Sequence, residues 1–160
     1  MLKTIISLDY LWNRVRVQGG AYGSSATFAR NGNLFMTSYR DPNLKETLTV
    51  FDEVESYLRE FQADRRQMTK YILGTISKLD APLTPSMKGE RSAAHYLSGI
   101  TFDDLQKERD QIIATTDQDI RLAADLVGIT MRQNLYCVLG NETKIKENQE
   151  LFKKLIPVFE

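Results

Sequence analysis

The first twenty residues carry apolar side chains at the spacing of an amphipathic helix. Apolar residues recur three or four positions apart, at Ile5, Leu8, Leu11, Trp12 and Val15. Residues at this spacing share one face of an α-helix, so the segment is predicted to be helical. Gly19-Gly20 can end that helix, because glycine takes the left-handed C-cap conformation without a Cβ penalty.

A β-hairpin is predicted next. The β-prone segments 21–30 and 33–39 flank Asn31-Gly32. Asn-Gly between two such segments favours a hairpin, since a type I′ turn needs positive φ at both central positions. We therefore predict two antiparallel strands joined by a type I′ turn at Asn31-Gly32.

A helix is predicted after the second strand. Asp41-Pro42-Asn43 closes the strand, and Asn43 with Glu46 fits a capping box. An apolar stripe at helical spacing then continues to Phe61. The pattern predicts one helix from Asn43 to about residue 61.

The rest of the chain is predicted to be mostly helical. Pro82 and Pro85 place a loop at 80–86, and a short β-prone run at 136–139 predicts a third strand. Helices are expected at about 69–79, at 86–97, from Thr101 with Asp104, from Thr116 with Asp119, and at 143–155. Three strands with six or seven helices give an α+β fold, an antiparallel sheet packed against several helices in a single domain over 1–160.

Composition and charge exclude some partners. The 21 Lys and Arg balance the 21 Asp and Glu among 160 residues, so no bulk field favours nucleic acid or an anionic membrane. No apolar run reaches the roughly 18 residues of a membrane helix, and the N-terminal segment lacks the pattern of a signal or transit peptide. Cys137 is the single cysteine, which excludes an intrachain disulfide and favours a reducing compartment.

The sequence offers no complete catalytic set of its own. A zinc hydrolase needs three protein ligands, usually including two histidines, but His95 is the single histidine and no His-x-x-Glu-His occurs. We expect no metal site in this chain, His95 at the surface or half-buried, and Cys137 packed inertly in an apolar strand. Gly19-Gly20-Ala21-Tyr22-Gly23 follows a helix and lacks Gly-Lys-Ser/Thr, so a helix stop is a better interpretation than a phosphate loop.

Arg16 and Tyr22 lie on either side of the glycine turn between the first helix and the hairpin. A guanidinium and a phenol at such a junction can donate hydrogen bonds to a carbonyl oxygen or a developing oxyanion. From spacing alone the alternative stays open that Arg16 pairs with a surface carboxylate and Tyr22 packs on the sheet.

Three stretches resemble one family. They are Leu-Trp-Asn-Arg-Val-Arg-Val-Gln-Gly-Gly-Ala-Tyr-Gly at 11–23, Ser-Tyr-Arg-Asp-Pro-Asn at 38–43, and Thr-Phe-Asp-Asp-Leu-Gln-Lys-Glu-Arg at 101–109, leading into Thr116 and Asp119. Together they resemble the presequence-protease branch of the insulinase (pitrilysin-type) zinc metallopeptidases. The resemblance covers nearly the whole chain and falls in the last domain of a protein several times longer.

The resemblance implies a function. Members of this family are clamshells of two homologous halves, in which the N-terminal half holds zinc through His-x-x-Glu-His and a distal glutamate. The C-terminal half contributes an arginine and a tyrosine that reach the bound peptide, and Arg16 and Tyr22 match that pair. The chain is therefore expected to be a substrate-chamber domain of a zinc-dependent metalloendopeptidase that degrades short unfolded peptides. Its partners would be the peptide and the N-terminal catalytic half, and alone it would be inactive.

This sequence departs from the family in two respects. It lacks the zinc motif, and the family's C-terminal domain has strands before the first helix that are missing here. We therefore expect an insulinase-type domain truncated at its N-terminus, with an exposed sheet edge that leads to self-association. A non-catalytic scaffold or partner subunit of a peptidase complex is the alternative function, and an unrelated α+β binding domain is a third. The expected compartment is a bacterial cytoplasm.

Overall fold

A computed structural model describes residues 1–158. The elements, in chain order, are α1 (Leu2–Ile5), the π-helix η1 (Ile6–Gln18), β1 (Gly23–Phe28), β2 (Leu34–Tyr39), α2 (Lys45–Asp52), α3 (Val54–Arg59), α4 (Arg65–Leu79), α5 (Pro85–Leu97), α6 (Phe102–Ala114), α7 (Asp117–Leu122), α8 (Ala124–Met131), α9 (Glu142–Glu147) and the 3-10 helix η2 (Gln149–Leu151). The α+β class is confirmed, with two antiparallel strands in this part of the chain. Within the same residues, no helix is both long and apolar enough to cross a bilayer.

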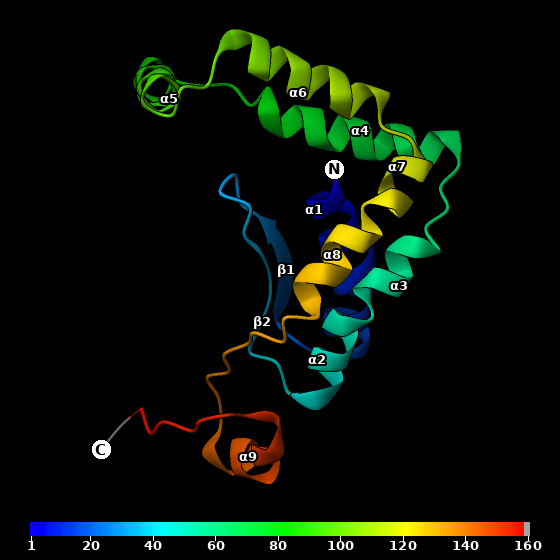
Figure 1. Cartoon of the computed structure of the whole chain (residues 1–160), viewed down its shortest axis with the longest axis vertical. Helices are drawn as coiled ribbons and strands as arrows, with labels where there is room; N and C mark the ends of the chain where they lie inside the picture. Colours follow the sequence, from blue (N-terminus) through cyan, green and yellow to red (C-terminus); the bar gives the residue numbers. More distant parts are fainter. Residues whose placement is uncertain (159–160) are drawn as a thin grey trace.

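The core forms where the hairpin meets three helices. In Figure 1 the hairpin lies along one side of a group formed by η1, α3 and α8, whereas α5 and α6 extend above it and α9 lies below. The buried apolar residues come mainly from these central elements and include Leu11, Val15, Ala26, Leu58 and Val127. By contrast, α5 contributes no buried residue. The hairpin and the end of η1 are therefore held by the best packed part of the molecule.

The first helix is confirmed, but its winding differs from the prediction. The N–H of Gly19 donates to the carbonyl of Arg14 at 3.1 Å, the five-residue spacing of a π-helix. Residues four and five positions apart then share the buried face, namely Ile6, Tyr10, Leu11 and Val15. Leu8 and Trp12, predicted to be buried at a 3.6-residue period, are instead 55% and 43% exposed.

Tyr10 shows how this helix joins the second half of the core. Its hydroxyl donates to the carbonyl of Val50 at 2.7 Å, and its ring stacks on that of Tyr57 with centroids 4.6 Å apart. Burial raises the pKa of Tyr10 to about 12, against a smaller opposing effect of the Arg14 charge. The phenol therefore stays neutral and hydrogen-bonded across the pH range in which proteins are usually studied.

The hairpin is confirmed, but its turn type was wrong. The N–H of Ala29 donates to the carbonyl of Asn33 at 2.8 Å, and the N–H of Gly32 donates to the carbonyl of Ala29 at 3.0 Å. Gly32 has φ +88° and Asn31 has no positive φ. The connection is thus a three-residue loop in which a type I turn precedes a left-handed glycine, a common alternative to type I′.

Capping residues at the helix ends predicted the position of several helices correctly. Thr101 with Asp104 and Thr116 with Asp119 each form the predicted capping box. At the end of α5, the N–H of Ile100 donates to the carbonyl of His95 at 2.9 Å, with Gly99 at φ +65°. This is the Schellman motif, a left-handed glycine with closing backbone hydrogen bonds, which is typical of helix C-termini.

Three predictions near the chain's helices were wrong. The expected helix to Phe61 is broken at Glu53 into α2 and α3, and no strand forms at 136–139, where Cys137 and Leu139 are exposed. The expected helix over 143–155 is instead α9 followed by η2. No second strand lies beside 136–139 in the described structure to accept its hydrogen bonds, which is why β-propensity there produced no strand.

Candidate functional site

The junction between η1 and β1 is closed by backbone hydrogen bonds. The N–H of Gly20 donates to the carbonyl of Arg16 at 2.9 Å, and that of Ala21 to the carbonyl of Val15 at 3.1 Å. Gly20 has φ +80°, a conformation that glycine adopts without strain. The chain therefore reverses into the hairpin within a few residues, and Arg16 and Tyr22 lie on either side of the reversal.

The loop after β2 braces this junction. The side-chain amide of Asn43 donates to the carbonyl of Gly19 at 2.5 Å. Asp41 holds the loop in shape, because one carboxylate oxygen accepts from the N–H of Asn43 at 2.9 Å and the other from the hydroxyl of Thr47 at 2.7 Å. Asn43 was predicted to cap the next helix, and that prediction was wrong, since its side chain binds the end of η1 instead.

Gly19 is expected to be essential to this geometry. A Cβ at Gly19 would lie 2.6 Å from the carbonyl oxygen of Val15, whereas one at Gly23 would meet nothing within 4 Å. Gly19→Ala should therefore lower the free energy of unfolding by about 1–3 kcal/mol. Gly23→Ala, the same change four residues later, should be neutral or slightly stabilising. Urea denaturation followed by circular dichroism checks this, and equal midpoints for the two variants would contradict it.

Arg16 lies on the last turn of η1 and is half-buried. Its guanidinium carbon lies 4.0 Å from the ring centroid of Trp12, the arrangement of a cation–π contact. No carboxylate pairs with Arg16 in the part of the chain that the structure describes. Its guanidinium N–H groups therefore retain the capacity to donate to a ligand.

Tyr22 precedes β1 and its side chain is 66% exposed. Its backbone N–H donates to the carbonyl of Tyr39 at 3.1 Å, and the two rings meet edge to face with centroids 6.0 Å apart. The guanidinium of Arg40 lies 5.9 Å from the Tyr22 ring and 5.4 Å from the Tyr39 ring. The phenol of Tyr22 is thus held by its neighbours while remaining open to solvent.

The structure brings Arg16 and Tyr22 to one junction without joining them. No hydrogen bond or ring contact connects the two side chains within residues 1–158. Sequence reasoning assigned no role to Tyr39 and Arg40, although both lie in the Ser-Tyr-Arg-Asp-Pro-Asn stretch. The signal that could have found them is the hairpin register, which places Tyr39 opposite Gly23, next to Tyr22.

Arg40 is unusual because it has φ +48°. The left-handed region costs a non-glycine residue about 1–2 kcal/mol, and such residues cluster at functional sites. The contacts of the Arg40 guanidinium with two exposed tyrosine rings offset part of this cost. Together with Arg16 on Trp12, the junction presents two cations and three aromatic rings.

Residues 1–158 offer no set of side chains that fits a zinc site. No group of three or more His, Cys, Asp or Glu side chains is placed to hold a metal ion within the described residues. His95 is half-buried near the end of α5, as predicted. Cys137 was predicted to pack in the core and is instead exposed, because the segment around it does not join the sheet.

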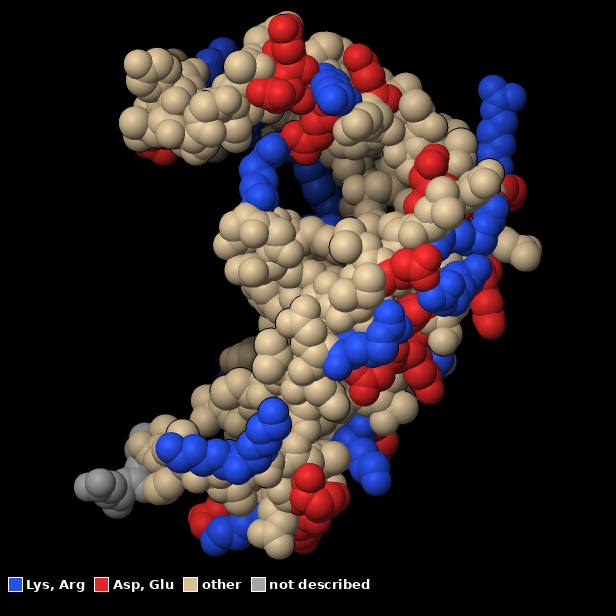
Figure 2. Space-filling model, in the orientation of Figure 1, with Lys and Arg blue, Asp and Glu red and all other residues tan. Residues whose placement is uncertain are grey.

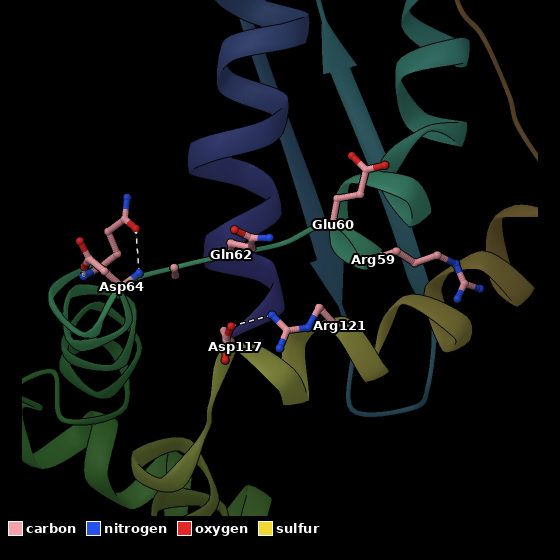
Figure 3. A pocket seen from close by; sticks show the side chains of 8 residues that line it. Arg59, Glu60, Gln62, Asp64, Asp117 and Arg121 are labelled. Carbon is pink, nitrogen blue, oxygen red and sulfur yellow. Dashed lines mark hydrogen bonds and ion pairs between the residues drawn. The ribbon is translucent and has the colours of Figure 1, made fainter.

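A pocket lies away from this junction. An open pocket of about 660 Å³ is lined by residues of α3, α4, α7 and the link between α3 and α4. Figure 3 shows Arg121 turned toward Asp117, with which it pairs at 2.6 Å, whereas Arg59 points away from that pair. Asp64 and Gln67 bond each other in the capping box of α4. Both arginines of the lining are engaged in ion pairs, Arg121 with Asp117 and Arg59 with Glu55 and Asp125, which favours a structural role.

Charge is distributed unevenly on the face in Figure 2. Lys and Arg intermingle with Asp and Glu over α3 and α8, whereas the hairpin shows mostly other residues. Glu55 accepts hydrogen bonds from Arg59 at 2.7 Å and from Arg132 at 2.5 Å. These hydrogen bonds, the one from Arg59 most strongly, and the two positive charges lower the pKa of the Glu55 carboxyl. The charged side chains over α3 and α8 therefore form a network of ion pairs that joins these two helices.

Comparison with known proteins defines the class of the chain. It is 48% identical to Protein HypA of Clostridium perfringens over 97% of its own length, which is 16% of that protein. It is 38% identical to Presequence protease 1, chloroplastic/mitochondrial, of Arabidopsis thaliana over 78% of its length, which is 12% of that protein. Presequence protease, mitochondrial, of Xenopus tropicalis is 31% identical over 96% of the chain, which is 14% of that protein.

These relatives indicate a peptidase-related domain, and the chain spans only 12–16% of their length. The sequence profile of the PreP C-terminal domain matches residues 1–139. The chain belongs to the family of PreP C-terminal domains, which confirms the resemblance to presequence proteases.

Proposed function

We propose that this chain is a substrate-chamber domain of a zinc-dependent metalloendopeptidase that degrades short unfolded peptides. Membership of the PreP C-terminal domain family, whose relatives are named presequence proteases, supports a peptidase function. The observation that carries the proposal further is the junction itself, where Arg16 and Tyr22 flank a tightly closed turn. Within residues 1–158, no carboxylate pairs with Arg16, and the Tyr22 side chain is 66% exposed.

The proposed mechanism uses this chain's two donors. The Arg16 guanidinium and the Tyr22 hydroxyl donate hydrogen bonds to the carbonyl oxygen of the scissile peptide bond. Negative charge grows on that oxygen as the tetrahedral intermediate forms, so fixed donors bind the transition state more strongly than the ground state. The hydrogen bond from Asn43 to Gly19 holds the loop after β2 against the end of η1. These two segments therefore do not have to be ordered during the reaction.

Zinc would supply the activated water in such an enzyme. Because no metal-ligating cluster occurs among the described residues, the metal and the general base belong in this proposal to an N-terminal half, either of the same polypeptide or of a partner. The chain would then act as the half that holds the peptide.

Tyr22→Phe tests the proposal with a one-atom change. In a polypeptide that contains this domain and the zinc-bearing half, the variant should lower kcat for peptide hydrolysis by about 10- to 100-fold. Tyr39→Phe is the matched control, because it removes the same hydroxyl from the ring that contacts Tyr22. Its kcat should remain within about twofold of the unmodified protein.

Equal losses in the two variants, or no loss in either, would contradict the role of Tyr22. The coding DNA upstream of the Met1 codon separates the two ways of supplying zinc. A continuous reading frame with His-x-x-Glu-His would make this domain part of an active peptidase. A start at Met1 would make it a separate partner subunit, and the assay would then use both chains.

A further inference from the structure

Arg40 lies between the end of β2 and the loop that braces the junction. On one side, Tyr39 is the last residue of β2 and belongs to its ladder with β1. On the other side, Asp41 accepts two hydrogen bonds, one from the N–H of Asn43 at 2.9 Å and one from the hydroxyl of Thr47 at 2.7 Å. The backbone of Arg40 is therefore anchored on both sides.

The backbone of Arg40 is also joined to Tyr22. The N–H of Tyr22 donates to the carbonyl of Tyr39 at 3.1 Å and to that of Arg40 at 3.4 Å. Consecutive residues of a regular antiparallel strand direct their hydrogen-bonding groups alternately toward and away from the partner strand. The φ of +48° at Arg40 ends this alternation, so that two neighbouring carbonyls face one N–H. The left-handed residue thereby ties Tyr22 to the end of β2.

The side chain of Arg40 contacts the ring of Tyr22 as well. Its guanidinium carbon lies 5.9 Å from the ring centroid of Tyr22 and 5.4 Å from that of Tyr39, within the range of cation–π contacts. The two rings also meet edge to face. Because the Tyr22 side chain is 66% exposed, these two neighbours, rather than burial in the described part of the core, restrict the rotation of its ring.

An ion pair does not account for the position of this guanidinium. Within residues 1–158, no carboxylate lies at ion-pair distance from Arg40. The left-handed backbone costs a non-glycine residue free energy, and residues held in such conformations cluster at functional sites. The contacts of Arg40 with Tyr22, through both backbone and side chain, therefore suggest where its role lies.

We propose that Arg40 is a positioning residue for Tyr22, whose ring the guanidinium holds so that the hydroxyl is oriented before the carbonyl oxygen of the peptide arrives. The inference rests on the proposed function, in which the Tyr22 hydroxyl donates to that oxygen. A donor that is held in place beforehand does not have to be ordered as the reaction proceeds. Without the guanidinium, the ring would sample more orientations, and the cost of ordering it would add to the barrier.

This role has an expected kinetic signature. Donation to a developing oxyanion is stronger in the transition state than in the ground state, so loss of positioning should lower kcat with little change in KM. The loss cannot exceed that caused by removal of the Tyr22 hydroxyl. We therefore expect kcat to fall by about 3- to 10-fold when Arg40 no longer holds the ring.

Two substitutions separate the guanidinium of Arg40 from its backbone. Arg40→Gly removes the guanidinium but keeps the left-handed conformation, which glycine adopts without strain. It should show the expected loss of kcat. Arg40→Lys keeps a cation that can contact the same rings, and its kcat should remain within about twofold of the unmodified protein.

The test is a double-mutant cycle in a polypeptide that contains this domain and the zinc-bearing half. The values of kcat and KM for peptide hydrolysis are measured for the unmodified protein, Arg40→Gly, Tyr22→Phe and the double variant. If Arg40 acts through the Tyr22 hydroxyl, kcat of the double variant should lie within about twofold of that of Tyr22→Phe alone. If Arg40 contacts the peptide itself, the two losses should multiply, and the positioning role would be wrong.

A second measurement follows the ring without turnover. NMR relaxation of tyrosine rings labelled with carbon-13 in the 160-residue chain reports the order parameter of the Tyr22 ring. This order parameter should fall in Arg40→Gly and stay near that of the unmodified chain in Arg40→Lys. Tyr57, whose ring stacks on Tyr10, is the internal control and should be unchanged in both variants.

The outcomes separate this inference from the proposed function. If Tyr22→Phe leaves kcat unchanged, both are wrong. If Tyr22→Phe lowers kcat and Arg40→Gly does not, the proposed function stands and the role of Arg40 is wrong. An order parameter of the Tyr22 ring that is unchanged in Arg40→Gly would also overturn that role.

Discussion

Replacement of Arg16 by alanine is expected to lower kcat/KM for peptide hydrolysis by about 100- to 1000-fold, the usual cost of losing one donor to a developing oxyanion. A charged donor contributes more than a neutral one, so the loss should exceed that of Tyr22→Phe. The assay is peptide cleavage by a polypeptide that contains this domain and the zinc-bearing half. Arg16→Lys keeps the charge but loses the planar fork, and it should recover only part of the activity.

The stability of the same variant separates a role in the reaction from a structural one. Arg16 contacts Trp12 at the surface, and such a contact contributes about 0.5–1 kcal/mol. Arg16→Ala should therefore lower the free energy of unfolding by no more than about 1 kcal/mol. A larger loss of stability with a parallel loss of activity would indicate that Arg16 supports the junction.

Arg14 offers a matched control two residues earlier on the same helix. Its guanidinium pairs with Glu53 at 2.7 Å at the surface, and exposed ion pairs of this kind contribute about 0–1 kcal/mol. Arg14→Ala should change stability about as little as Arg16→Ala and leave peptide cleavage near that of the unmodified protein. Equal losses of activity in the two variants would remove the special role of Arg16.

Replacement of Leu11 by alanine is expected to lower the free energy of unfolding by about 3 kcal/mol. Leu11 is fully buried in η1 within the core that also includes Ala26 and Leu58. The change removes apolar contacts and leaves a cavity that rigid neighbours fill only in part. For a chain of this length the loss corresponds to a midpoint temperature lower by about 6–12 °C.

Leu73→Ala provides the control for that measurement. Leu73 lies on α4 and is 62% exposed, so the same change should shift stability by less than about 0.5 kcal/mol. Both variants are compared at one fixed protein concentration, so that any association would affect the two measurements alike. A small effect of Leu11→Ala would mean that η1 does not form part of the cooperative core.

Much of the local structure could be predicted because its causes lie close together along the chain. The capping boxes at Thr101 and Thr116 and the glycine stop after α5 depend on residues within a few positions of each other. The hairpin around Asn31-Gly32 likewise needs only two β-prone segments and a turn. The peptidase-related family could also be recognised from short stretches, because such a comparison needs only the order of the residues and not their tertiary structure.

The candidate site was predicted in part. The positions of Arg16 and Tyr22 on either side of a glycine turn follow from the order of residues, and the structure places both at that junction. Their neighbours did not follow from the sequence. The contact of Arg40 with the rings of Tyr22 and Tyr39 requires the paired strands and a left-handed backbone at residue 40.

The sequence by itself thus determined the α+β class, the family, the hairpin and the capped starts of α6 and α7, because each can be recognised from residues close together along the chain. Only the tertiary structure decided how η1 winds, where Asn43 donates and whether 136–139 becomes a strand. Asn43 reaches the carbonyl of Gly19, 24 residues away along the chain, and β-prone residues at 136–139 have no strand beside them. Such choices depend on which distant segments come into contact, and that is set by packing of the whole core.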